Sequence, residues 1–220
     1  MTADQRLQLI SVKIERAKKH IRDLEVEVEA FLQLKPYIFL VEDNPETGKT
    51  HVYYRLRETE TPAIILAITG DVLFNLRAAL DHLAYHLARI NTADEHILKQ
   101  TYFPIFDDAT KYKNWAPQKL EGMKQSAIQA IDAIEPYQGG KGHVLWQLNR
   151  LNNMDKHRTV VTMGCKFTGV NEEVGQNMEV TFTVALDEPP IVECQPLLPT
   201  LVGMTDRVDD LILSFRPLLA

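Results

Sequence analysis

Hydrophobic residues recur at steps of three and four over two long stretches of the chain, and this spacing predicts two long helices. The first stretch begins at Leu7 and keeps a heptad pattern to Phe31, whereas the second runs from about Pro62 to Ile90. Pro62 suits a first helical turn. The apolar positions are Leu7, Ile10, Ile14, Ala17, Ile21, Leu24, Val28 and Phe31, then Leu73, Leu76, Leu80, Leu83 and Leu87.

Each of these stripes must be buried, so we expect the two helices to pack as an antiparallel pair. A second copy of the chain is the alternative partner for the first helix. Residues 37–41 and 51–57, which lie between the helices, are rich in β-branched and aromatic residues and flank turn-forming residues 43–48. This pattern predicts a β-hairpin insert, with either a basic, aromatic binding face or a merely solvated one.

The chain after Ile90 predicts a loop that continues to about residue 106, followed by two further helices over 117–134 and 143–156. Alternating residues then predict strands over 159–167 and 178–186, a short extended piece over 191–194, and a last helix through Met204 and Phe215. We therefore expect one α+β domain over residues 1–220, mainly helical. Its four-helix-bundle-like core would cover about 1–158 with the hairpin at 37–57, and a C-terminal β/α segment would cover 159–220.

Composition narrows the classes of function. The formal net charge of −6 argues against bulk attraction to nucleic acid, so any RNA contact would be local. The N-terminus lacks the apolar core of a signal peptide, and no run of about 18 apolar residues suggests a membrane span. The two cysteines are too few for a disulfide framework. We expect a soluble cytoplasmic protein without a cofactor or a membrane partner.

Two clusters of polar residues are candidates for chemistry. The first lies on the second long helix, where His82 and His86 fall opposite the leucine stripe while Arg77 and Asp81 lie on its flank. The second covers residues 149–158. There Asp155 lies within about 20° of the apolar stripe if the helix persists, so it needs a partner in the core. The alternative is that the helix ends by Asn153 and leaves Asp155 in a solvated cap.

The segments Asn75-Leu-Arg-Ala-Ala-Leu-Asp-His-Leu83, Phe103-Pro-Ile105, Glu135-Pro-Tyr-Gln138 and Asp155-Lys-His-Arg158 resemble a group of uncharacterised bacterial proteins over roughly residues 64–160. This resemblance carries no established activity. More loosely, an Arg followed by a His after four to six residues on a helical bundle resembles the HEPN superfamily. That superfamily includes metal-independent ribonucleases of toxin and phage-defence systems, which commonly act as dimers.

The likeness to the HEPN superfamily implies an RNA-processing or defence protein that attacks a phosphate with the adjacent 2′-hydroxyl. Arg77 with His82, or Arg150 with His157, would match its motif, although Ala78 or Leu151 follows the Arg where that family usually has a polar residue. The implied catalytic residues are Arg77, His82, Asp155, His157 and Arg158. Asn75, Asp81, Arg150, Asn152 and Lys156 would bind or support.

Two other hypotheses use the same residues. In the first, Arg77, Asp81 and Asp155 form a buried ion network that pins two helices in a non-catalytic structural or interaction module, whose partner is encoded in the same operon or is a second copy. In the second, His82 and His86 share a divalent metal with Asp71, Asn75 or His157. The ribonuclease hypothesis, in contrast, requires no metal and assigns no metal ligand.

Overall fold

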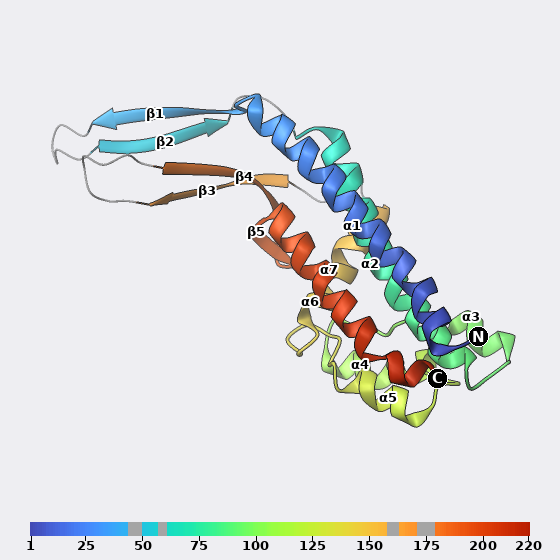
Figure 1. Ribbon diagram of the computed structural model, residues 1–220. Helices are drawn as coiled ribbons and strands as arrows, with labels where there is room; N and C mark the ends of the chain where they lie inside the picture. The colour runs from blue at the N-terminus through green and yellow to red at the C-terminus, as the bar shows by residue number, and fades with distance from the viewer. Residues whose placement is uncertain (44–49, 57–60, 158–162, 171–178) are drawn as a thin grey trace.

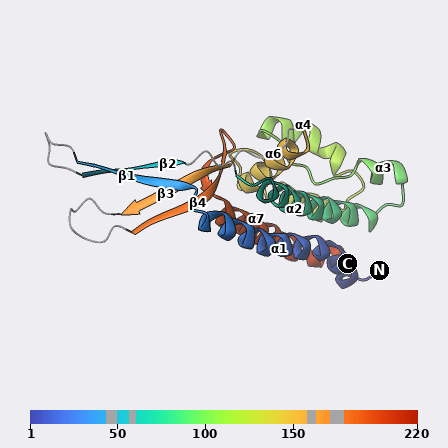
Figure 2. The same ribbon diagram turned by 90° about the horizontal axis from the view of Figure 1, so that it is seen from above.

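The computed structural model describes the backbone of residues 1–43, 50–56, 61–157, 163–170 and 179–220, and the side chains of 1–36, 61–156 and 183–220. Helices α1, α2, α6 and α7 lie side by side as a bundle, and two β ribbons project from the end of the bundle where α1 finishes (Figures 1 and 2). Both chain termini lie at the opposite end. The predicted class, mainly helical α+β with a four-helix core, is confirmed.

Helix α1 spans Ala3–Gln33 and is the longest element of the bundle. The hydroxyl of Thr2 accepts a hydrogen bond from the Gln5 N–H while the Gln5 side chain accepts one from the Thr2 N–H, which is a capping box. Six of the eight predicted heptad positions are buried, and Leu7 and Ile21 pack partly against the same core. The heptad stripe therefore packs within one chain, against α2 and α7.

Helix α2 spans Ala63–Arg89, and all five leucines of its predicted stripe are buried in the core. Although no 18 consecutive residues of α2 are all apolar, the helix is by length and composition apolar enough to cross a membrane. Its most apolar window is 56% buried inside the bundle, and the helix contacts α1, α6 and α7. A central position in the core accounts for this composition without a membrane.

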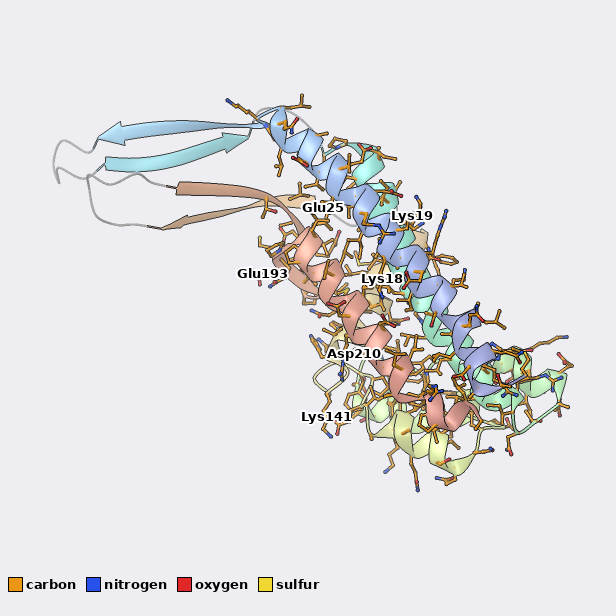
Figure 3. All side chains as sticks on the ribbon, viewed as in Figure 1. Lys18, Lys19, Glu25, Lys141, Glu193 and Asp210 are labelled. Carbon is orange, nitrogen blue, oxygen red and sulfur yellow. The ribbon has the colours of Figure 1, made fainter. Side chains whose placement is uncertain are left out.

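The bundle is completed by α6, which spans His143–His157, and α7, which spans Leu197–Ser214. The amine of Lys18 on α1 lies 2.6 Å from the Asp209 carboxylate on α7, and Figure 3 shows Lys18 between these two helices. A short 3-10 helix, Arg216–Leu219, follows α7 and packs on α1. The C-terminal helix thus takes the bundle position that the sequence assigned to residues 117–134.

The prediction of one helix over 117–134 is wrong. Helix α4 spans Ala109–Lys119 and α5 spans Gln125–Asp132, with a break between them. Gly122 adopts φ +83°, a left-handed conformation that interrupts an α-helix and favours glycine. The Tyr112 hydroxyl on α4 donates a 2.7 Å hydrogen bond to the Asp132 carboxylate on α5. The expected loop after Ile90 also contains a short helix, α3, at Glu95–Gln100, capped by Asp94.

The first ribbon is the predicted hairpin, in which β1 (Tyr37–Asp43) pairs antiparallel with β2 (Thr50–Leu56). The second contains β3 (Met163–Val170) and β4 (Glu179–Glu188), and β5 (Val192–Pro196) pairs with the end of β4 nearest the bundle. The described part of the strand predicted over 159–167 begins at Met163, and predicted positions 159–162 lie outside the described residues.

Candidate functional site

Arg77 joins three parts of the fold. Its side chain is buried, with the residue only 8% exposed. Nε donates a 3.0 Å hydrogen bond to the Asn149 amide oxygen on α6, and Nη2 donates a 2.9 Å hydrogen bond to the Phe103 carbonyl oxygen. Nη1 lies 2.8 Å from the Asp81 carboxylate one helical turn along α2. The guanidinium therefore ties α2 to α6 and to the segment between α3 and α4.

Asp81 closes this arrangement, because its carboxylate also accepts a 3.0 Å hydrogen bond from the Phe103 N–H. We call Arg77, Asp81, Asn149 and the Phe103 backbone the arginine cluster. Burial lowers the pKa of Arg77, and the charge of Asp81 opposes that effect. Since a guanidinium stays protonated in proteins, the cluster holds a fixed positive charge beside a partly exposed carboxylate.

Asp155 meets α2 at a different place. Helix α6 continues through His157, so the alternative in which Asp155 occupies a solvated cap is wrong. A Cβ added to Gly70 would lie 2.7 Å from both Cγ and Oδ1 of Asp155. The carboxylate therefore packs directly on the glycine backbone. Burial raises the pKa of Asp155, and the nearby charge of Asp71 raises it further.

Asp155 and Arg77 do not share a contact. Their positions of contact on α2, Gly70 and Arg77, are seven residues apart, which is about 10 Å along a helix axis. Arg77, Asp81 and Asp155 therefore do not form the single buried network of the structural hypothesis. Residues of α6 touch α2 at both positions, but among the described residues these are two separate contacts rather than one pocket of ionisable groups.

Lys156 lies beside Asp155 and contacts an exposed aromatic ring. Its amine is 5.9 Å from the ring centroid of Phe74, and the amine of Lys13 on α1 is 5.7 Å from the same centroid. Phe74 is 49% exposed, so these cation–π contacts are at the surface and weak. The side chain of His157 and all of Arg158, two of the predicted catalytic residues, lie outside the described part of the chain.

His82 and His86 lie on the side of α2 that faces α1, and not on the side that contacts α6. They line an open pocket of about 490 Å³ with Leu9, Asp81, Tyr85 and Thr101. Burial is the main cause that lowers the pKa of both histidines. The positive charge of Lys13 lowers the pKa of His82 further, and the charge of His82 lowers that of His86 further. Both rings are therefore neutral near pH 7, which is the form that accepts a proton.

The three predicted supporting residues Asn75, Asn152 and Arg150 have different surroundings. The Asn75 amide donates a 2.8 Å hydrogen bond to the Asp71 carbonyl oxygen within α2. Asn152 is 2% exposed, and its amide nitrogen has no hydrogen-bond partner among the described residues. The side chain of Arg150 is 47% exposed, and its Nη1 lies 3.8 Å from the Asp107 carboxylate.

Two partners in the arginine cluster had no predicted role. Asn149 belongs to the second polar cluster, but spacing along one helix could not show that its partner is Arg77. The Phe103 backbone lies in the Phe-Pro-Ile segment, where only tertiary structure reveals the two hydrogen bonds to Arg77 and Asp81. No group of three His, Cys, Asp or Glu residues within the described ranges has the arrangement of a metal site.

Comparison of the chain with models of protein families, with curated proteins and with solved structures gave no match. We therefore infer the function from the geometry of the arginine cluster, the histidine pocket and the β ribbons.

Proposed function

We propose that this chain is a non-catalytic interaction module, in which a braced helical bundle presents two β ribbons to a protein partner. One observation carries the proposal: both ribbons project from the same end of the bundle (Figures 1 and 2). In the described residues β1 pairs with β2, and β3 pairs with β4 on one side only, so strand edges are left available. A two-stranded ribbon alone is marginally stable in water, and free strand edges pair readily with other chains.

The arginine cluster supports a structural role for the motif that resembles the HEPN superfamily. A catalytic Arg must reach a phosphate, but Nε and Nη2 of Arg77 donate to Asn149 and to Phe103, and Nη1 is buried 2.8 Å from the Asp81 carboxylate. Binding a phosphate would break these buried contacts, each of which stabilises the fold. The cluster fixes the position of α6 and of the segment before α4 on α2, and so supplies the rigidity that a presenting scaffold requires.

Site-specific photocrosslinking in extracts of the native host tests the proposal. We expect benzoylphenylalanine in place of Tyr53 on β2 to give a discrete adduct with a protein, because that position lies on a projecting strand. The matched control carries the same group in place of Val202, which is exposed on α7 of the bundle. Identical adducts from both positions, or none from Tyr53, would contradict the proposal.

Metal-independent RNA cleavage is a second candidate function, favoured by the neutral His82 and His86 in an open pocket. Such an imidazole suits a general base. Lys13, whose charge acts on His82, is a nearby cation that could bind a phosphate in this version of the site.

An RNA cleavage assay with a chelator present separates the two candidates. If the chain is non-catalytic, the wild type and the His82→Ala/His157→Ala variant will degrade single-stranded RNA at the same background rate. A loss of about a hundredfold or more in the variant would establish the second candidate, since acid–base groups contribute that much. Equal melting temperatures of the wild type and the variant would show that any loss of cleavage is not a loss of folding.

A further inference from the structure

A second cavity, of about 530 Å³, is lined on α6 by residues that are not part of the arginine cluster. It is bounded by the segment before α4, by α6 and by the connection from β4 to β5. Its apolar walls include Trp146, Met154 and Ile191, and its charged lining residues are Asp107, Arg150 and Glu188. The volume is within the range of small-molecule sites, and the lining combines apolar walls with polar and charged side chains that could orient a ligand.

Trp146 and Asp107 form a fixed wall of the cavity. The Trp146 indole N–H donates a 3.3 Å hydrogen bond to the Asp107 carboxylate, and the His143 ring stacks on Trp146 with centroids 5.1 Å apart. Lys111 donates a 2.9 Å hydrogen bond to the other oxygen of Asp107. The hydrogen bond from Lys111 lowers the pKa of Asp107, so a negative charge is held at the cavity.

Arg150 places a positive charge beside that negative one. The distance of 3.8 Å between its Nη1 and Asp107 Oδ1 is too long for a hydrogen bond. Among the described residues the guanidinium makes no shorter polar contact, so its donors remain available to a ligand. The cavity thus offers a fork of donors and an ionised acceptor next to each other, with an apolar surface adjoining both.

We propose that this cavity binds a free hydrophobic α-amino acid. The adjacent carboxylate and ammonium groups of an amino acid match the adjacent Arg150 and Asp107, and an apolar side chain matches Trp146, Met154 and Ile191. A phosphate dianion fits less well because the Asp107 and Glu188 carboxylates line the same space. The site goes beyond the proposed interaction function, since it involves neither projecting ribbon.

Isothermal titration calorimetry with L-phenylalanine as the probe tests this site. We expect saturable binding to the wild type, and about tenfold or greater weakening in Arg150→Met, which loses the hydrogen bonds of a charged donor. Arg207→Met removes another exposed arginine, which lies on α7, and should leave the affinity unchanged. Asp107→Asn should weaken binding as well, because the ligand's ammonium group loses its counter-charge.

Two analogues of the probe test the recognition of both charges. N-acetyl-L-phenylalanine lacks the ammonium group and L-phenylalaninamide lacks the carboxylate, and each should bind about tenfold more weakly or worse. Absence of saturable binding by phenylalanine and leucine would overturn the proposal. Equal binding of the acetylated form, or an unchanged affinity in Arg150→Met with a native circular dichroism spectrum, would overturn it too.

Discussion

Replacing Arg77 with Met is expected to lower the free energy of unfolding by about 3 kcal/mol. Met keeps the apolar stem but removes every donor, so the Phe103 carbonyl and the Asn149 amide oxygen lose the hydrogen bonds of 2.9 Å and 3.0 Å that satisfy them. Asp81 loses its counter-charge as well, although its partial exposure reduces that contribution. Urea-induced unfolding followed by circular dichroism measures the change.

Two further variants serve as controls for Arg77→Met. Arg77→Lys keeps the charge but cannot reach three partners with one amine, so its stability should fall between those of the wild type and Arg77→Met. Arg89→Met removes an exposed arginine from the last turn of the same helix and should change stability by less than about 0.5 kcal/mol. If Arg77→Met is as stable as Arg89→Met, the cluster does not brace the bundle.

The long helices were predictable because their evidence is local. The stripes through Ile10 and Leu80 repeat at helical spacing, and burial of one face requires nothing beyond that spacing. Which helices complete the bundle was less predictable. Residues 117–134 keep an apolar period, but the left-handed conformation at Gly122 divides them, and α7 packs on α1 in their place. Competition between two amphipathic segments for one position is decided by tertiary packing.

The candidate site illustrates the same limit. The pair Arg77 and Asp81 has the i, i+4 spacing of a helical ion pair, so that contact could be anticipated. The sequence could not show that Arg77 also bonds Asn149 and the Phe103 carbonyl, which lie 72 and 26 residues away along the chain. The same residue types therefore suggested a catalytic motif from spacing, and the structural role proposed above rests on partners of Arg77 that spacing does not reveal.

The second large effect concerns Gly70. Its replacement by Ala should change the free energy of unfolding in opposite directions in the wild type and in the Asp155→Ala variant. In an otherwise wild-type chain the new methyl group meets the Asp155 carboxylate, with contacts of 2.7 Å to Cγ and Oδ1. Overpacking of this kind destabilises by about 1–3 kcal/mol, and it opposes the gain of about 1 kcal/mol from helix propensity. We therefore expect a net loss of stability.

With Asp155→Ala already present, the obstruction is absent and Gly70→Ala should stabilise the chain by up to about 1 kcal/mol. The expected coupling energy between the two positions is about 2 kcal/mol, measured by urea unfolding of the four proteins in the cycle. Gly203→Ala is the matched control, because a Cβ at this helical glycine of α7 meets nothing within 4 Å. It should stabilise both backgrounds equally. The same behaviour at Gly70 would mean that α6 does not hold Asp155 against α2.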